Sequence, residues 1–176
     1  MVENILKILN VARKWVIRSV EMKDLLFLEN GDEYQKYRSL MKLSFNDHMA
    51  GKKIYLVAEV EGKIAGQIII DKRILKDLSK SDGKTRAYIY SFRVFMPYQN
   101  QGLGTLMLQF CESLLRKTGF IYAVIAAEVK NPRALKLYER LGYKIFKQEC
   151  LPWEFIDEKG VQQKISEHEW VLEKKL

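Results

Sequence analysis

The chain has 176 residues, 48% of them hydrophobic, which is enough apolar material for one domain spanning residues 1–176. No apolar run approaches the roughly 20 residues that cross a membrane, so we expect no membrane partner. The formal net charge is +8, yet 22 acidic residues are spread among 30 basic ones without a block of five or more Lys or Arg. This pattern favours a soluble basic surface, suited to a small polyanionic ligand, over nucleic acid as a partner.

The first half of the chain predicts strands and helices behind an N-terminal extension. Residues 1–14 have the apolar spacing of an amphipathic helix and not the pattern of a signal peptide. The elements that follow are a strand at 15–20, helical periodicity at 22–29 and 32–49, and a β-hairpin at 53–71 that turns at 61–63. The next segment, 72–86, holds six basic and two acidic residues. It is long for a strand connection, which predicts either a mobile or a functional loop.

The second half predicts an alternation of strands and helices. Its elements are a strand at 87–95, a helix at 105–117, a strand at 120–129, a helix from an Asn131 N-cap to Gly142, and closing strands at 143–150 and 166–176. We expect 151–160 to be the loop between the closing strands, within a C-terminal strand region at 149–176. A crossover helix makes the strands at 87–95 and 120–129 parallel, whereas hairpins make the others antiparallel. The sequence therefore predicts an α/β (α+β) fold with a mixed, mostly antiparallel sheet and helices on both faces.

Cysteine and histidine are sparse. Cys111 and Cys150 are too few for a disulfide scaffold, which favours the reducing cytoplasm, and Cys111 lies in a helical stretch where we expect a buried thiol. His48 and His168 are far apart in the sequence and have no second ligand at metal spacing, so we expect no metal site. His48 ends a predicted helix, where we expect it to be solvated.

The stretch PYQNQGLGTLML, residues 97–108, places two glycines directly before an apolar helical pattern. A helix N-terminus has unpaired N–H groups and partial positive charge, and Gly102 and Gly104 would let a phosphate approach them closely. A plain turn would give the same short pattern. It is not a Walker loop, because no Gly-Lys-Ser/Thr follows, and Met107 stands where a dinucleotide loop has its third glycine.

This loop and a second motif together resemble the GNAT superfamily of N-acetyltransferases. Gln99, Gly102 and Gly104 match the family's acyl-CoA-binding pattern, Gln/Arg-x-x-Gly-x-Gly/Ala. The stretch NPRALKLYERLGY is similar to the second motif through Asn131, Ala134, Leu137, Tyr138, Gly142 and Tyr143. Met96 and Asn100 replace a Pro and a Gly that the family usually has. Two motifs in order with a strand between them are more specific than either alone, and the resemblance covers 55–146 best.

The resemblance implies the acyl-CoA N-acyltransferase fold, in which the central parallel strands splay apart around acetyl-CoA. It assigns pantetheine to the backbone of Phe92, Arg93 and Val94, with an N–H near Val94 as a donor to the thioester carbonyl. It assigns the pyrophosphate to amides of the loop and the helix start: Asn100, Gln101, Gly102, Leu103, Gly104 and Thr105. Asn131 of the second motif is assigned to the cofactor site as well.

The resemblance also implies that Tyr138 donates a proton to the CoA sulfur, since a tyrosine with an ordinary pKa near 10 is protonated at neutral pH. From its spacing among leucines alone, a packing role is favoured for Tyr138. The general base is not identified, because Ala126 and Tyr88 stand where relatives carry a glutamate. We expect Glu128 to be solvated at a strand end, which leaves Tyr88, Tyr90 and ordered water as candidates.

We therefore interpret the chain as an acetyl-CoA-dependent N-acetyltransferase that acts on a primary amine by direct attack in a ternary complex. The acceptor is an amine-bearing small molecule or a protein amine, and the aromatic and acidic residues of 151–160 would suit a cationic one. The alternatives are a noncatalytic acyl-CoA sensor or scaffold, the same fold with a longer acyl-CoA, and RNA binding through 72–86. A homodimer through the last strand is compatible with the sequence.

Overall fold

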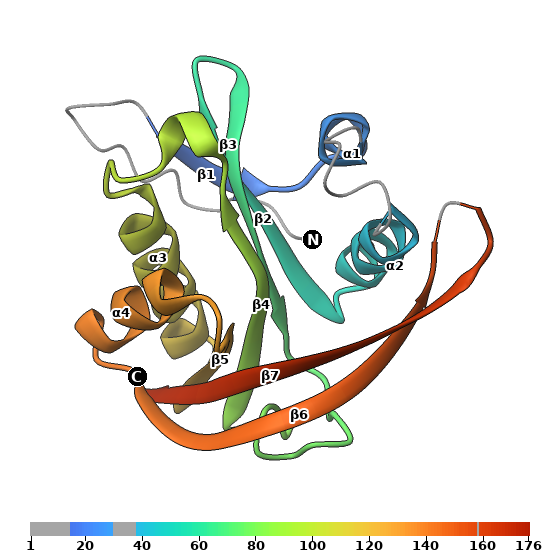
Figure 1. The fold of residues 1–176 in the computed structure, drawn as a ribbon. Coiled ribbons are helices and arrows are strands. Elements are labelled where there is room, and N and C mark those ends of the chain that lie inside the picture. Colours follow the sequence, from blue (N-terminus) through green and yellow to red (C-terminus); the bar gives the residue numbers. More distant parts are fainter. Residues whose placement is uncertain (1–14, 30–37, 158) are drawn as a thin grey trace.

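The computed structural model describes residues 15–29, 38–157 and 159–176. Within them the chain forms a seven-stranded sheet with the order β1-β2-β3-β4-β5-β7-β6 (Figure 1). The strands are β1 (Val16–Ser19), β2 (Lys53–Val60), β3 (Lys63–Asp71), β4 (Arg86–Val94), β5 (Tyr122–Glu128), β6 (Lys144–Ile156) and β7 (Gln162–Lys175). Neighbouring strands pair antiparallel except β4 and β5, which are parallel. The predicted mixed sheet is confirmed.

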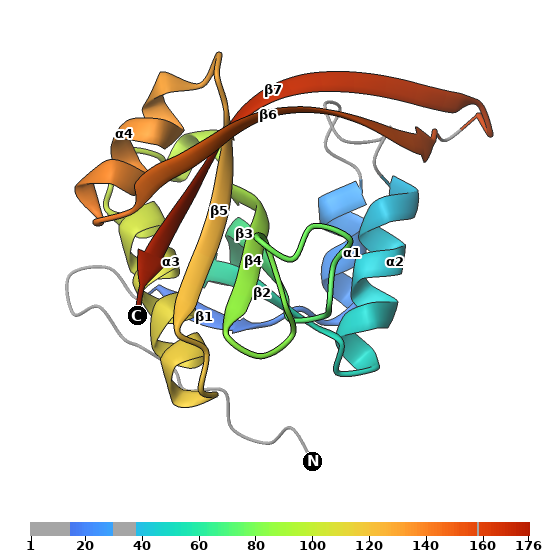
Figure 2. The same ribbon diagram turned by 90° about the horizontal axis from the view of Figure 1, so that it is seen from below.

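Helices cover both faces of the sheet, as Figures 1 and 2 show. On one face lie α1 (Met22–Glu29) and α2 (Arg38–Met49), and on the other α3 (Leu103–Lys117) and α4 (Pro132–Arg140). The helix predicted at 1–14 and the start of the one predicted at 32–49 lie outside the described residues. None of the described helices is long and apolar enough to cross a membrane.

A four-residue repeat fixes α3 on the sheet. Leu103, Met107, Cys111 and Leu115 recur on one face of the helix, and each is at most 1% exposed. Burying a Leu or Met side chain contributes about 1.5–3 kcal/mol, so this row holds the helix against the sheet. The buried Cys111 thiol confirms the expectation for this residue.

A β-bulge in β4 prepares the functional site. Gln67 pairs with Arg93 and Ile69 with Tyr90, so two residues of β4 oppose one of β3, and Ser91 adopts a positive φ of 48°. The extra residue reverses the alternation of side chains. Before the bulge, Tyr90 packs on the α1–α2 face, whereas after it Phe92 packs on the α3–α4 face.

The parallel pairing of β4 with β5 ends near this bulge. Its register runs from Arg86↔Tyr122 to Ile89↔Ile125, although both strands continue beyond these residues. Beyond Ile89, the β5-facing edge of β4 is therefore not part of the sheet ladder. This is the splayed pair that the family resemblance implied.

The C-terminal hairpin is longer than the sequence predicted. Most of 151–160, expected as a loop, continues β6 to Ile156, and β7 begins at Gln162. Pro152 is compatible with this extension, because β6 is an edge strand, where a residue without an N–H is tolerated. The hairpin arches past the sheet toward α2, whose Ser39 hydroxyl donates to the Ile156 carbonyl over 2.8 Å (Figure 2). Over Glu169–Glu173 both edges of β7 are used within the chain, which removes them from the predicted dimer contact.

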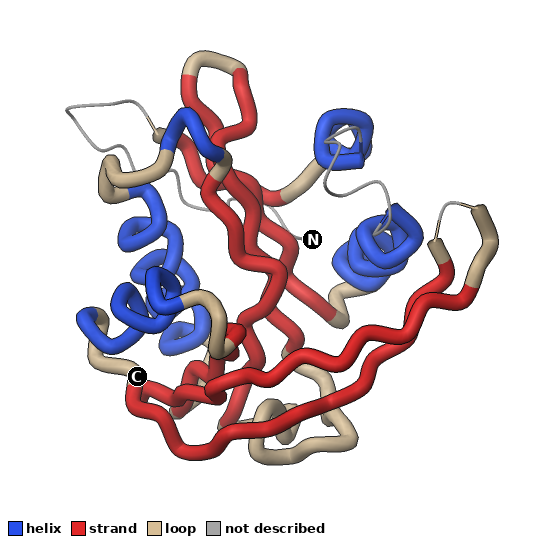
Figure 3. Tube along the Cα trace, in the orientation of Figure 1, coloured by secondary structure: helices blue, strands red, loops and turns tan. Residues whose placement is uncertain are grey.

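The basic connection between β3 and β4 is folded against this hairpin (Figure 3). The carboxylate of Asp82 accepts backbone N–H groups of Lys84, Thr85 and Arg86, and these bonds hold its pKa well below the ordinary range despite some burial. Lys80 is only 7% exposed and forms an ion pair with Glu149 of β6. The connection is thus an organised loop, and the burial of Lys80 weakens the case for RNA binding there.

Candidate active site

The glycine loop leads directly into α3. The helix begins at Leu103, two residues earlier than predicted, after Gly102 in the left-handed conformation with a φ of 85°. The Leu106 N–H donates to the Gly102 carbonyl over 3.1 Å, so the amides of Leu103, Gly104 and Thr105 precede the first intrahelical bond. The Leu103 side chain lies in the core, which leaves its backbone as the only part available for the predicted role.

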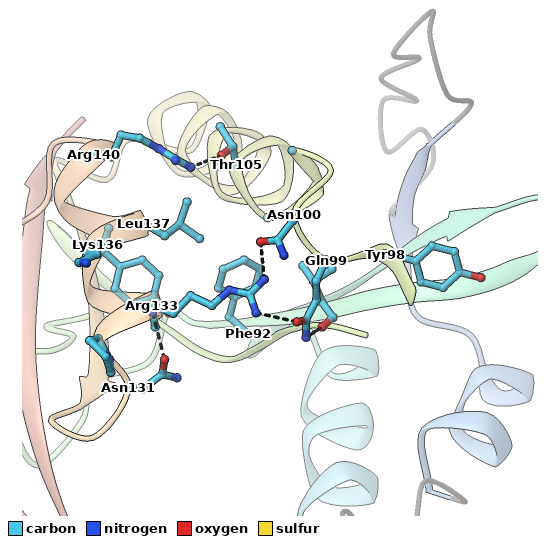
Figure 4. A pocket seen from close by; sticks show the side chains of 16 residues that line it. Phe92, Tyr98, Gln99, Asn100, Thr105, Asn131, Arg133, Lys136, Leu137 and Arg140 are labelled. Carbon is cyan, nitrogen blue, oxygen red and sulfur yellow. Dashed lines mark hydrogen bonds between the residues drawn. The ribbon is translucent and has the colours of Figure 1, made fainter. Parts of the chain in front are cut away.

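A cavity of about 690 Å³ lies in front of this helix start, between α3 and α4. We call it the cofactor cavity. Figure 4 shows three cationic side chains of α4 along it, Arg133, Lys136 and Arg140. Their spacing of three and four residues places them on one helix face. A positively charged helix start opposite a row of cations is suited to a ligand that carries several phosphates.

Arg133 connects the two walls of the cofactor cavity. Its guanidinium donates to Gln99 Oε1 over 2.8 Å and to Asn100 Oδ1 over 2.6 Å (Figure 4). Gln99 in turn donates from Nε2 to the Val94 carbonyl over 2.8 Å. The leading glutamine of the first motif therefore ties the loop to the end of β4. Sequence analysis missed Arg133, although the helical spacing of the α4 cations was a readable signal.

The other loop residues differ in their position. Asn100 has a positive φ of 59° and lines the cavity together with Gly102, Gly104 and Thr105. Gln101 is exposed, and its side chain donates to the Pro97 carbonyl over 2.9 Å.

The end of β4 forms the inner wall of the cofactor cavity. Phe92 and Val94 line it, whereas Arg93 lies between them on the strand and its side chain is not among the lining residues. The Phe95 N–H donates to the Ala65 carbonyl over 2.9 Å on the β3 side. Because an antiparallel ladder alternates, the Val94 N–H points to the opposite side, toward the gap beside β5.

A second cavity of about 200 Å³ continues through the gap between β4 and β5. We call it the acceptor cavity. It shares four lining residues with the cofactor cavity: Phe92, Asn131, Ala134 and Tyr138. Tyr88 and Tyr90 line it from the α1–α2 face, where their rings stack with centroids 5.8 Å apart. The two cavities therefore adjoin at these four residues, next to the bulge of β4.

Tyr138 lies where the cavities meet. It is 5% exposed, and its ring centroid is 6.4 Å from that of Phe92 and 6.1 Å from that of Tyr143. Burial raises the pKa of Tyr138 well above its ordinary value, which keeps the hydroxyl protonated at neutral pH. The residue thus packs in the core and lines both cavities, so the two interpretations of its position are compatible.

Asn131 organises the start of α4. Its side chain accepts the Ala134 N–H over 3.1 Å as the N-cap, as the sequence predicted. The same residue lines both cavities.

The residues considered for the general base have different surroundings in the structure. Burial, assisted by the carboxylates of Glu169 and Glu149, raises the pKa of Tyr88 well above 10, so its hydroxyl stays protonated at neutral pH. Ala126 and the exposed Glu128 line the acceptor cavity. Glu169 of β7 also lines it, and sequence analysis did not consider it because strand pairing alone brings it there.

The structure contradicts the expectation that His48 is solvated. His48 is half-buried, and its Nδ1 lies 3.3 Å from both the Lys53 carbonyl oxygen and the Tyr55 nitrogen. Burial lowers its pKa, so it is a structural residue and not a solvated one. Within the described part of the chain, no group of three or more His, Cys, Asp or Glu residues is placed to hold a metal ion.

The sequence model of the acetyltransferase (GNAT) family matches residues 19–143, so the chain belongs to this family. A search of curated protein sequences gives no match.

Solved structures show the same fold at low sequence identity. A ribosomal-protein alanine N-acetyltransferase from Escherichia coli has a TM-score of 0.65 at 19% identity, covering 92% of this chain and 93% of its own. An N-acetyltransferase from Staphylococcus aureus has a TM-score of 0.68 at 14% identity, covering 92% and 98%. A GNAT family acetyltransferase from Elizabethkingia anophelis, solved with acetyl-CoA bound, has a TM-score of 0.58 at 18% identity, covering 92% and 98%.

Proposed function

We propose that the chain is an acetyl-CoA-dependent N-acetyltransferase that transfers the acetyl group to a primary amine by direct attack. The observation that carries this proposal is the meeting of the two cavities at the bulge of β4. There a cosubstrate from the α3–α4 side and an acceptor from the other side reach the same residues. Direct transfer needs both substrates at the same residues at one time, because the acetyl group passes to the amine without first being bonded to the enzyme.

The cofactor cavity fits the nucleotide end of acetyl-CoA. The amides at the start of α3 would hold the pyrophosphate, and Gly102 and Gly104 leave room for its oxygens. Arg133, Lys136 and Arg140 would add charge-assisted contacts from the opposite wall. Binding would redirect Arg133 from Gln99 and Asn100 toward the phosphates.

The gap beside β4 fits the pantetheine arm and the thioester. An amide-bearing arm would pair with the β5-facing edge of Phe92, Arg93 and Val94, as an added strand does. The Val94 N–H would then donate to the thioester carbonyl oxygen, where negative charge develops during attack. Tyr138, protonated at neutral pH, would donate to the departing sulfur.

The acceptor reaches the acetyl group from the side of α2 and the β6–β7 hairpin. Tyr88, Glu128 and Glu169 line the acceptor cavity there. Carboxylates and aromatic rings attract ammonium groups, which supports a cationic amine on a small molecule or a protein. An N-acetyltransferase acting on a ribosomal-protein alanine shares the fold, which makes a protein N-terminus one acceptor class to include.

Calorimetry with acetyl-CoA tests the cosubstrate site. Gly102→Val should weaken binding severely, because the side chain would stand at the phosphate site in a strained conformation. Gly62→Val is the matched control, since Gly62 also has a positive φ and open space around it but lies in the β2–β3 turn. Undiminished affinity in Gly102→Val would refute the proposed site.

Thiol release from acetyl-CoA with a panel of amines tests the reaction itself. The panel should hold a polyamine, an aminoglycoside, free amino acids and peptides with N-terminal alanine. Accelerated release with at least one of them supports an enzyme. Tight binding of acetyl-CoA without acceleration by any amine would instead support a noncatalytic sensor, and faster release from a longer acyl-CoA would identify that as the cosubstrate.

A further inference from the structure

A row of three carboxylates crosses the sheet beside the acceptor cavity. Glu169 of β7 pairs in register with Glu128 of β5 on one side and with Glu149 of β6 on the other. Their surroundings differ: Glu128 is exposed at the end of its strand, whereas the Glu149 and Glu169 side chains are 11% and 24% exposed. Glu169 and Glu128 line the cavity, and Glu149 does not.

Lys80 lies closer to one of the two inner carboxylates than to the other. Its Nζ forms a close ion pair with Glu149 and lies 3.8 Å from Glu169 Oε2. Glu149 is paired a second time, with Lys147 at 2.8 Å. These hydrogen bonds outweigh burial and lower the pKa of Glu149. Glu149 is therefore held as a fixed anion, while Glu169 has a more distant cation and faces the cavity.

Every neighbouring charge around Glu169 acts on its proton affinity. Burial raises its pKa above the ordinary value, Lys80 opposes this, and the like charges of Glu167, Glu149 and Glu128 reinforce it. The Tyr88 hydroxyl adds no charge at neutral pH, because its own pKa is raised. A carboxylate of raised pKa is a stronger base than an ordinary one.

We propose that Glu169 is the general base, which takes a proton from the acceptor ammonium, and that Lys80 is the positioning residue that holds the Glu169 carboxylate at the cavity. This inference rests on the proposed function. Glu169 lines the same small cavity as Tyr138, so the proposed base and acid both border the place where the amine would meet the thioester. Tyr88 stays protonated and Glu128 is exposed, which makes both weaker candidates. The Tyr90 hydroxyl lies 3.3 Å from the Ser44 hydroxyl of α2, with which it pairs.

The proton balance of the step is complete without any other reactant. Glu169 accepts one proton from the ammonium, and the neutral nitrogen attacks the thioester carbonyl carbon. The carbon–nitrogen bond forms, the carbon–sulfur bond breaks, and Tyr138 gives its proton to the departing sulfur. The second proton lost by nitrogen restores the Tyr138 hydroxyl, and Glu169 releases the first to water. The products are the amide, the thiol and one proton.

Glu169→Gln tests the assignment through the pH profile of kcat/KM. The assay is thiol release with saturating acetyl-CoA and the amine of the panel that gives the fastest reaction. At pH 7 we expect a loss of about 100-fold, the lower end for removal of a general base. The loss should shrink as pH rises toward the amine's own pKa, because the amine then loses its proton without help. A loss that stays equal at all pH values would indicate a structural role and overturn the assignment.

Two glutamine variants provide controls. Glu128→Gln removes a carboxylate from the same cavity, and Glu154→Gln removes an exposed one from the outer part of the same hairpin. Glu154→Gln should keep the pH profile and stay within about threefold of the parent rate, as changes of solvated surface carboxylates do. Glu128→Gln should raise the KM for the amine, because it removes a negative charge from the acceptor cavity, but it should leave the shape of the pH profile unchanged. If Glu128→Gln shows the pH-dependent loss and Glu169→Gln does not, the base is Glu128 and our assignment is wrong.

Further measurements separate the ways in which the test can fail. Acetyl-CoA affinity by calorimetry should be unchanged in Glu169→Gln, because the residue lies outside the cofactor cavity. If Glu169→Gln does not fold, Glu169→Asp replaces it, because it keeps a shorter carboxylate. This variant should react more slowly but still lose kcat/KM as the pH falls, which we call the acidic limb of the profile. An unchanged rate and profile would overturn the assignment. A parent protein that no amine accelerates would refute the proposed function, whereas an active parent with an unaffected Glu169→Gln would refute only the base.

Discussion

The two cavities share Tyr138 and three other residues, yet opposite charges line their outer parts. The cofactor cavity has three cations of α4 and a helix N-terminus, whereas the acceptor cavity has the carboxylates of Glu128 and Glu169. The first surface is suited to a polyanion and the second to an ammonium ion. Under the proposed function, this difference would attract each substrate to its own cavity. The uncharged Tyr138 phenol lies where the two cavities adjoin.

Removal of the Tyr138 hydroxyl changes a residue that lines both cavities, and we expect this change to have the largest effect on activity. Tyr138→Phe should lower kcat by about 100- to 1,000-fold in the thiol-release assay and change acetyl-CoA affinity less than twofold. Because burial raises the pKa of Tyr138, the parent enzyme should lose no activity from its ionisation below pH 10, the ordinary pKa of tyrosine. A parent rate that falls with a pKa near 9 and is restored in the variant would contradict this role.

Filling the space at Gly66 tests the bulge that divides the cavities. A Cβ on Gly66 would lie 2.7 Å from the Arg93 carbonyl oxygen, a backbone atom that cannot move without distorting β4. Gly66→Ala should therefore lower the free energy of unfolding by about 1–3 kcal/mol, measured by urea denaturation. Gly104→Ala is the control, since its nearest contacts would be side chains at 3.4 Å, and we expect a change below about 1 kcal/mol. Equal effects would argue against strain at the bulge.

Removal of a cation on one side should leave the other side unchanged. Arg133→Ala should weaken acetyl-CoA binding about tenfold, equivalent to about 1.4 kcal/mol, and reduce its salt dependence, without changing the KM for the amine. Arg116→Ala, at the exposed end of α3, is the control for the loss of one positive charge and should bind normally. Comparable weakening in both variants would show that the overall field of the protein is responsible and not Arg133 itself.

The smallest expected effect is a shift of a pH profile. The charge of Lys80 lowers the pKa of Glu169, so Lys80→Met should raise that pKa further. The acidic limb of kcat/KM, which requires ionised Glu169, should then move to higher pH. Lys76→Met changes an exposed lysine of the same loop and should leave the limb in place. A limb that moves to lower pH in Lys80→Met would contradict the sign of this coupling.

The cofactor side was largely predictable from the sequence. Glycine spacing, the Asn131 N-cap and the crossover connection are local signals, and they predicted the helices and the parallel pair. The family resemblance named half of the residues that line the cofactor cavity. Its assignments for Arg93 and Leu103 concern backbone groups, so they are compatible with side chains that lie outside the lining and in the core.

The acceptor side was not predictable in the same way. Glu169 reaches the cavity because β7 is inserted between β5 and β6, a pairing that no local pattern encodes. Lys80 is buried only because its loop folds against the hairpin. The hairpin itself was predicted too short. In the structure β6 continues through Pro152, because an edge strand tolerates a residue without an N–H, and the pairing of Pro152 with Ser166 is set by the partner strand.

The arched hairpin has a consequence for how its tip can vary. Only Glu169–Lys175 of β7 pair with β5, so the outer parts of both strands reach past the body of the sheet toward α2 (Figure 2). Beyond Glu169 the strand pairing of β6 and β7 is with each other. We therefore expect that the tip can be lengthened or shortened without altering the pairing of β7 with β5 or the cavity between α3 and α4.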